Sequence, residues 1–381
     1  MARGSRRPEQ AALAHSDAAA RVMDASAKGA GLSWPLVPWE RTGSLSQRLS
    51  ENPFLMAPMA GVTDAAWRLM ARAGGAALAY SEMVSVTGMH YASEKTWELV
   101  DPNPAEPELA VQLFGREPDH FREAVAGVRE RLSERLALID INMACPVPKV
   151  VRNGAGSALL DEAGVAADIV RACLSEAGDV PVTCKIRIGR RPGAIVGADF
   201  ARSMEEAGVS AVAVHGRTAT QMYSGVADRG AIAEVVRAVS VPVIASGDAL
   251  DAPRAAALLR DTGAAGVFVA RGSYGNPWVF SQARELLSDV GSLGADGAPC
   301  ASAAVADVSL DWRLAAFRLH VDLLEATGAH LARARSLAAW YLKAVPDAAT
   351  WRERAMHCDN ADEYRALIDA ARLACEDAGL L

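Results

Sequence analysis

The sequence predicts an α/β fold, a (β/α)8 TIM barrel, from two observations. From residue 54 onward, short apolar runs rich in branched or aromatic residues alternate with segments of helical period, which is typical of a parallel sheet. Eight such runs fall within about 230 residues, and this fits the usual barrel length of about 250 residues. The expected strands are FLMAP from residue 54, ALAYSEM from 77, LAVQLFG from 109, LALIDIN from 136, VTCKIRI from 182, AVAVHGR from 211, VPVIASG from 241 and GVFVARG from 266.

Polar side chains stand at or just beyond the carboxyl ends of successive runs. One such residue would mean only that a strand has ended, but a series of them favours a functional site. In a barrel these strand ends converge on the mouth, where active sites lie. The residues concerned are Glu82, Gln112, Asn142, Lys185, His215, Asp248 and Arg271.

Composition excludes several classes of protein. The chain has 381 residues, 51% of them hydrophobic, and its apolar runs are far shorter than a membrane span, which requires about 20 residues. With no signal-peptide pattern, a cytoplasmic protein is expected. The six cysteines form no CxxC pair and no Cys/His cluster, so neither a disulfide framework nor a metal site is predicted. Because the net charge is −7, any RNA contact is expected from local basic clusters.

The first 33 residues differ in character from the rest. They are rich in Ala, Ser and Arg with almost no apolar periodicity, which is typical of disorder. We therefore expect a disordered extension over 1–33 and the barrel over 34–288.

The segment from residue 138 carries a candidate catalytic thiol. An apolar run ends in Asn142, and Cys145 follows on a loop with two prolines and two glycines. A lone thiol on a strand-end loop, beside an amide and the basic residues Lys149 and Arg152, is placed like a proton donor or a nucleophile. The alternative is a buried core cysteine, the more usual fate of a free thiol.

The last two runs predict a phosphate site. Glycines and backbone amides follow both runs, in ASGDAL at 245–250 and ARGSYGNPW at 270–278, and Arg271 adds a cation. Many barrels hold a phosphate at this corner, although glycine also ends strands for steric reasons. Lys185 is costly to bury without an anionic partner. A salt bridge or a flavin would supply that partner, with His215 and Arg271 facing the phosphate.

Short motifs occur in a fixed order between about residues 52 and 285. They are APMAGVTD at 57–64, SEM at 81–83, VQLFG at 111–115, DINMACPVPKVVRNGAGSALL from 140, CKIRIG from 184, HGRT at 215–218, ASGD from 245 and ARG from 270. Together they resemble the signature set of the bacterial tRNA-dihydrouridine synthases. AAWYLK at 338–343 resembles the C-terminal helical domain with which that family grips tRNA. The resemblance thus implies a linker over 289–308 and a small all-helical tRNA-binding domain over 309–381.

The resemblance also implies a role for each matching residue. Cys145 matches the general acid, Asn142 the residue that positions the uracil, and Arg187 and Arg217 are placed to approach substrate or flavin. NADPH would reduce FMN, which would deliver hydride to C6 of uracil while Cys145 protonates C5. tRNA contacts are expected from Lys149, Arg152, Arg335 and Lys343, and the protein is expected to act as a monomer. The implied FMN-binding residues are Pro58, Met59, Ala60, Gln112, Lys185, His215, Ser246, Gly247, Asp248, Ala270 and Arg271.

The chain departs from the family pattern at a few positions. Ser246 replaces the asparagine of NGD, Ala144 the glycine before the cysteine, and Ser336 and Leu337 the Lys and His of an RKH segment that begins at Arg335. These departures predict weaker flavin retention and a weaker grip on tRNA. They keep two alternatives open: an FMN-dependent dehydrogenase or reductase of a free pyrimidine, and a tRNA-binding protein with impaired catalysis.

Overall fold

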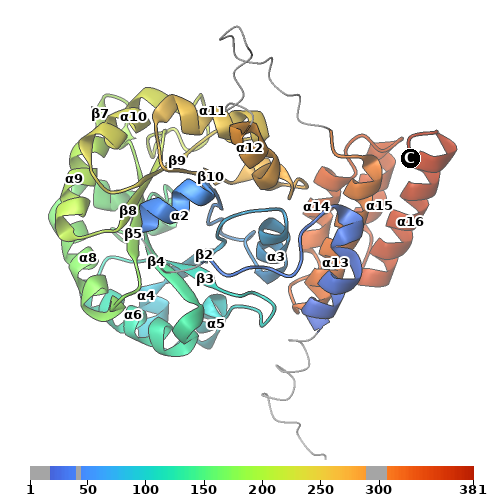
Figure 1. Cartoon of the computed structure of the whole chain (residues 1–381). Helices are drawn as coiled ribbons and strands as arrows, with labels where there is room; N and C mark the ends of the chain where they lie inside the picture. Colours follow the sequence, from blue (N-terminus) through green and yellow to red (C-terminus); the bar gives the residue numbers. More distant parts are fainter. Residues whose placement is uncertain (1–17, 40–43, 289–306) are drawn as a thin grey trace, which may run out of the picture.

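The computed structural model describes residues 18–39, 44–288 and 307–381. Within them, eight strands form one parallel sheet in the order β1-β10-β9-β8-β5-β4-β3-β2, ringed by helices (Figure 1). Each strand overlaps one predicted run, so the predicted fold class is confirmed. The strands are β1 (Phe54–Met56), β2 (Tyr80–Ser85), β3 (Leu109–Phe114), β4 (Leu136–Met143), β5 (Val182–Arg187), β8 (Ala211–His215), β9 (Val243–Ser246) and β10 (Gly266–Val269).

Backbone hydrogen bonds join the two edges of this sheet. Ala77 N donates to Phe54 O at 2.8 Å, and Met56 N donates to Leu78 O at 3.0 Å, just before β2 begins. The sheet therefore closes into a barrel, and the carboxyl ends of its strands meet at one mouth.

Helices follow the strands and cover the outside of the barrel. Several begin at an aspartate whose carboxylate accepts a backbone N–H of the first turn, as Asp64, Asp228 and Asp251 do, and such caps stabilise a helix by about 1 kcal/mol. The main covering helices are α3 (Ala65–Ala73), α4 (Val86–His90), α6 (Pro118–Leu132), α8 (Ala163–Ala177), α9 (Gly197–Ala207), α10 (Arg229–Ala238), α11 (Ala252–Thr262) and α12 (Val279–Ser288). Shorter elements are α2 (Leu45–Glu51), α5 (Glu94–Trp97), α7 (Pro148–Val151), η2 (Glu98–Val100), η3 (Ser133–Arg135), η4 (Gly156–Asp161), η5 (Arg271–Ser273) and the hairpin β6 (Gly189–Arg191) and β7 (Ala194–Ile195).

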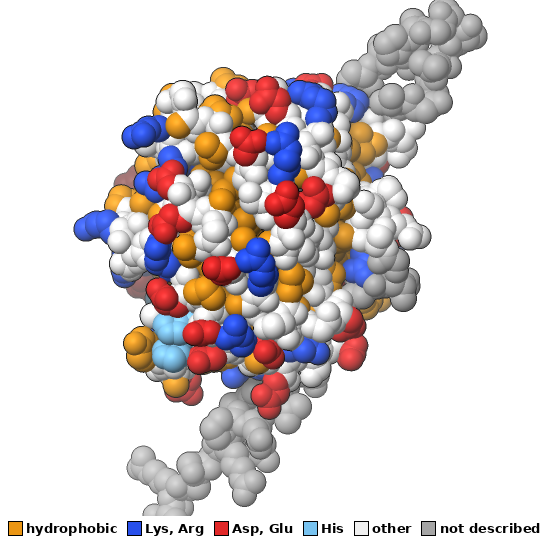
Figure 2. Space-filling view, turned by 90° about the vertical axis from the view of Figure 1, so that its left-hand side faces the viewer, with side chains coloured by type: hydrophobic (Ala, Val, Ile, Leu, Met, Phe, Trp, Pro, Cys, Tyr) orange, Lys and Arg blue, Asp and Glu red, His pale blue; other side chains and the backbone are white. Residues whose placement is uncertain are grey.

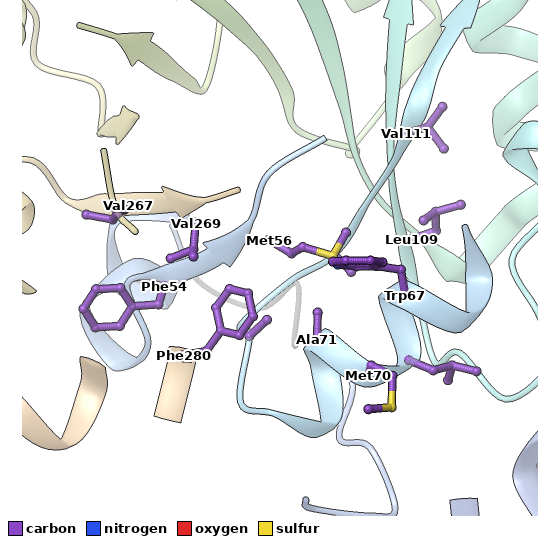
Figure 3. Close-up of a cluster of buried hydrophobic side chains, with 14 of the residues drawn as sticks. Phe54, Met56, Trp67, Met70, Ala71, Leu109, Val111, Val267, Val269 and Phe280 are labelled. Atoms are coloured by element: carbon purple, nitrogen blue, oxygen red, sulfur yellow. The ribbon is translucent and has the colours of Figure 1, made fainter. Parts of the chain in front are cut away.

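Alternate residues of several strands enter two separate cores. In β1, Phe54 and Met56 face the helices, where they pack with Trp67 and Phe280 (Figure 3). Leu55, between them, packs inside the barrel. Each such side chain contributes about 1.5–3 kcal/mol when it is fully buried, so this alternation fixes the face that each strand shows to the interior.

Residues 18–33 are ordered, so the expectation of disorder over 1–33 is wrong for this part; residues 1–17 lie outside the described residues. Residues 18–26 are helical and lead into η1 (Lys28–Ala30). Met23 and Ala27 are buried, and Trp278 Nε1 donates to Ala30 O at 2.8 Å. The segment is ordered by contacts with elements far along the chain, which weak local periodicity does not reveal.

Four helices make up the C-terminal part, which lies beside α3 (Figure 1). They are α13 (Leu310–Ala326), α14 (Arg333–Tyr341), α15 (Ala348–Met356) and α16 (Ala361–Asp377). The expected linker over 289–308 lies almost entirely outside the described residues. Within the part of the chain that the structure covers, no helix has the length and apolarity needed to cross a membrane.

Candidate active site

A cavity of about 480 Å³ opens at the carboxyl ends of the barrel strands. All the residues predicted to bind FMN line it, together with Cys145, Asn142 and Arg187. They come from the ends of most strands and the loops that follow, so residues distant in the sequence share one space. The FMN set in this cavity is Pro58, Met59, Ala60, Gln112, Lys185, His215, Ser246, Gly247, Asp248, Ala270 and Arg271.

A chain of hydrogen bonds orients the amide side chains in the cavity floor. Asn142 Nδ2 donates to Gln112 Oε1 at 2.8 Å, and Gln112 Nε2 donates to Asp140 Oδ2 at 2.6 Å. Thr183 Oγ1 donates to the other oxygen of Asp140 at 2.6 Å. Sequence analysis did not single out Asp140, although a carboxylate inside an apolar strand was a signal that it had partners. Its hydrogen bonds fix which way both amides point.

Lys185 is a buried cation that borders the cavity. Its ammonium has no hydrogen bond or ion pair to any other residue that the structure describes. Burial, reinforced by the nearby charge of Arg187, lowers its pKa from 10.5 to about 8, against the attraction of Asp140. A buried ammonium without a partner is costly, so an acceptor or an anion supplied by a ligand would stabilise it.

Asn142 also holds the loop that carries the thiol. Its Oδ1 accepts the backbone N–H of Ala144 at 3.1 Å and of Cys145 at 2.9 Å. Gly156, with φ +59, packs so closely that a Cβ there would lie 2.7 Å from Cys145 O. Burial raises the pKa of the half-buried thiol above its ordinary value, although Val147 N–H and Arg187 oppose the shift. Cys145 is therefore protonated at neutral pH, as a proton donor must be.

The glycines after β9 and β10 allow close packing at the predicted phosphate corner. Gly247 has φ +121, and a Cβ there would lie 2.7 Å from Ala227 Cβ. A Cβ on Gly272 would lie 2.3 Å from Ala249 O. His215 stands beside this corner, where burial and the charge of Lys185 lower its pKa to about 2. It is therefore a neutral hydrogen-bonding group rather than a cation.

Two arginines meet Asp248 at this corner, and only one of them borders the cavity. Arg217 is buried, and its Nη2 donates to both oxygens of Asp248 at 2.8 and 2.7 Å and to Gly225 O at 2.7 Å. Arg217 itself does not line the cavity, although its Nη1 lies 3.4 Å from Nε2 of His215, which does. Arg271 lies 3.4 Å from Asp248, is half-exposed and lines the cavity. Arg271 is therefore the cation at this corner that can contact a ligand. Arg217 instead holds the loop after β8 in place.

Arg187 ties the thiol loop to the loop after β8. It donates to Ala144 O through Nε and to Thr218 O and Met222 O through Nη1, each at 2.9 Å. Tyr223 lies at the cavity rim between Arg187 and Arg271, with the guanidinium carbons 5.9 and 5.6 Å from its ring centre. Sequence analysis missed Tyr223, because an aromatic residue in a loop carries no signal of its partners.

The structure does not bring the expected tRNA-contacting residues into the cavity. Lys149 and Arg152 are exposed on and just after α7, beside the thiol loop, and Lys343 is exposed after α14. Arg335 lies 3.8 Å from Asp359 in an ion pair. On the face shown in Figure 2, Lys and Arg alternate with Asp and Glu among the described residues, without a continuous basic area. Local basic clusters remain the expected means of phosphate contact.

Comparison with known proteins agrees with the motifs. The family described as "Dihydrouridine synthase (Dus)" matches residues 55–376. "Probable tRNA-dihydrouridine synthase 1" of Synechocystis is 34% identical over 87% of this chain and 90% of that protein. "tRNA-dihydrouridine synthase B" of Xanthomonas campestris is 38% identical over 82% of this chain and 90% of its own length. A "Probable tRNA-dihydrouridine synthase" of Rhodobacter capsulatus is 41% identical over 65% of this chain and 75% of that protein. The chain belongs to the dihydrouridine synthase family.

Proposed function

We propose that the protein is a tRNA-dihydrouridine synthase that uses FMN, with NADPH as the reductant and Cys145 as the proton donor. One observation carries this proposal: a protonated thiol, an unpartnered buried lysine and a glycine-rich corner with a cation all border the same cavity. These are the elements that a reductive step on a pyrimidine ring requires. Family membership supports tRNA uridine as the substrate.

The residues present fit a flavin mononucleotide. Lys185 would receive the acceptor that it lacks, and Gly247 and Arg271 line the same corner of the cavity, where a glycine turn beside a cation suits a phosphate. The cavity of about 480 Å³ lies within the range of about 300–1,000 Å³ that ligand sites show. When bound and reduced, FMN supplies a hydride to the pyrimidine.

The chain's own residues hold the substrate and supply the proton. Asn142 sets the position of the Cys145 loop and presents its amide edge at the cavity floor. Cys145 Sγ–H donates a proton to C5 of the uracil, and the thiolate then regains a proton from solvent. Arg187 and Lys185 stand near enough to favour that thiolate. Because uracil must leave its stack to reach this cavity, the tRNA is held with the target base flipped out.

Two departures from the family pattern, Ala144 and Ser246, are compatible with this site. Ala144 is not among the residues with positive φ, so the backbone does not require a glycine, and its N–H is bonded to Asn142. Ser246 lines the cavity at the end of β9. Its hydroxyl is a polar group there, although it is shorter than the amide of the asparagine in the family pattern. These positions favour a competent enzyme over a tRNA-binding protein that has lost catalysis.

The test compares substrates for one purified protein. We expect a yellow protein that oxidises NADPH and forms dihydrouridine in tRNA from cells that lack the gene, as measured by mass spectrometry of nucleosides. Free uracil and uridine are the control substrates, and NADH is compared with NADPH. Reduction of free uracil without reduction of tRNA would favour the alternative of a free-pyrimidine reductase. A colourless protein that binds tRNA without modifying it would overturn the proposal.

A further inference from the structure

A second cavity, of about 280 Å³, lies between the barrel and the C-terminal helices. The barrel contributes Val62, Trp67 and Tyr274 to its wall, and the C-terminal helices contribute His320, Arg333 and Trp340. Val62 and Tyr274 also line the active-site cavity. The two cavities are therefore neighbours along one wall.

Aromatic rings dominate this interdomain cavity. Tyr274 contacts both tryptophans of the wall, with its ring centroid 5.2 Å from that of Trp67 and 5.1 Å from that of Trp340, both edge to face. Trp340 is 43% exposed, so part of its indole surface remains open to a ligand beside its contact with Tyr274. Exposed indole and phenol faces of this kind are platforms on which nucleobases stack.

The polar groups in the wall are held in place, and one lacks a partner. Arg333 donates to Asp64 at 2.6 Å and to Glu82 at 3.0 Å, which fixes its guanidinium. His320 is 2% exposed, with Nδ1 3.2 Å from Tyr341 Oη. Its Nε2 has no hydrogen-bond partner among the described residues, and burial lowers its pKa to about 3, so the ring is neutral. The wall therefore combines aromatic surface with a neutral hydrogen-bonding group.

We propose that the interdomain cavity binds one nucleobase of the tRNA strand, a close neighbour of the uridine that enters the active site. This inference rests on the proposed function. The cavity is smaller than the range of about 300–1,000 Å³ typical of sites for larger ligands, which suits a single flat ring. A strand that delivers one base to the active-site cavity passes the shared wall of Val62 and Tyr274, where the next flipped-out base meets the aromatic cluster. Stacking is tolerant of sequence, so the site grips the strand without demanding one base.

The experiment combines tRNAs that lack one base with protein variants that lack one aromatic ring, in the full-length holoenzyme. Substrate tRNAs carry a single abasic nucleotide, placed in turn at each position flanking the target uridine. Wild-type protein is compared with Trp340→Leu and with Trp312→Leu, a control at a 44% exposed tryptophan that does not line the cavity. Ser336→Trp, at an exposed position on the cavity wall, fills the space without removing any contact.

We expect one abasic position to lower kcat/KM of the wild type and of Trp312→Leu by about 5- to 150-fold, the range that corresponds to one stacked base. For Trp340→Leu and Ser336→Trp, kcat/KM with this abasic tRNA should be nearly the same as kcat/KM of the same variant with intact tRNA. Affinities measured without NADPH in a Cys145→Ala background, where turnover is slowed, should show the same coupling. If dihydrouridine forms but every abasic penalty is equal in wild type and Trp340→Leu, the cavity is only a solvent-filled seam and the inference is wrong. Failure of the wild type to form dihydrouridine would instead overturn the proposed function.

Discussion

The side-chain oxygen of Asn142 accepts the backbone N–H of Cys145 at 2.9 Å, so the amide that faces the cavity floor also holds the thiol loop. Its Nδ2 is committed to Gln112 Oε1 at 2.8 Å. The position of the proton donor and the orientation of the floor amides therefore depend on the same side chain. A substitution at Asn142 therefore changes the position of the Cys145 thiol, even though the two side chains have different chemical roles.

Replacement of Asn142 separates these two functions. Asn142→Ala removes both acceptor bonds to the loop, and we expect about a 10²-fold loss of tRNA reduction, the cost of a catalytic group misplaced by about 1 Å. Asn142→Asp keeps an oxygen for the Ala144 and Cys145 amides, so its loss should be smaller. The measurement is single-turnover dihydrouridine formation by prereduced enzyme. If Asp is as damaging as Ala, the Nδ2 donor is the important group and loop positioning is secondary.

Cys145→Ala should retain the flavin and its reduction by NADPH but lose dihydrouridine formation. General acid catalysis contributes about 10²- to 10⁴-fold, and the loss should fall only in the step that oxidises the flavin. Because burial raises the pKa of the thiol, the wild-type rate of that step should not fall through deprotonation of Cys145 across the neutral pH range. Stopped-flow absorbance follows the two half-reactions separately. Near-normal turnover on tRNA would show that Cys145 is a packing residue.

Arg271 should determine whether the cofactor phosphate is recognised. We expect Arg271→Ala to weaken FMN binding by about 10- to 150-fold, the range for one hydrogen bond to a charged group, while riboflavin binding changes little. Arg254→Ala, at an exposed arginine on α11 paired with Asp251, is the control. Fluorescence titration of the apoprotein with both flavins measures this. An equal loss for FMN and riboflavin would place the phosphate elsewhere.

Lys185 should destabilise the flavin-free protein at neutral pH. Its pKa is lowered to about 8 in the folded state from 10.5, so between these values the unfolded chain binds more protons and stability rises with pH. The penalty is full below pH 8 and amounts to about 3 kcal/mol, since each pKa unit is worth about 1.4 kcal/mol. Lys185→Met should therefore stabilise the apoprotein in urea unfolding at pH 7, with a difference that shrinks as the pH approaches 10.5. A difference that is independent of pH would indicate altered packing instead.

The barrel and its mouth could be predicted from the sequence because local chemistry determines them. Runs such as VTCKIRI, rich in branched residues and set between helical segments, form buried strands, and the polar residue at each run's carboxyl end lies at the mouth. Asn142, Lys185 and Arg271 were found in this way, and each lines the cavity.

Contacts between distant segments could not be predicted. The acidic residue that follows Arg217 in its own loop, Asp228, caps α10. Arg217 instead pairs with Asp248, on the loop after the neighbouring strand β9, at 2.7 Å. Met23 lies in a segment of small residues whose burial depends on helices far along the chain. Leu337 stands where the family pattern has a basic residue, but its side chain is buried, so a cation at this position would have no access to a phosphate.

Binding of tRNA should depend only weakly on salt. The expected contacts are few: Lys149, Arg152 and Lys343 are exposed, and Arg335 is shared with Asp359. The logarithm of the binding constant falls by about 0.7 to 0.9 per neutralised phosphate for each decade of salt. We therefore expect a plot of log K against log salt that is clearly shallower than about six phosphate contacts would give.

Of the two positions that lack the family's basic residues, only Ser336 is exposed. Ser336→Lys should therefore steepen the slope by about 0.7 to 0.9, whereas Leu337→Lys should lower the free energy of unfolding without steepening it, because a buried ammonium is costly. Filter-binding affinities across a salt series, with unfolding curves for each variant, measure both effects. A wild-type slope equivalent to about six or more phosphates would show that other residues grip the tRNA, and that the basic residues missing from α14 are replaced by cations elsewhere on the surface.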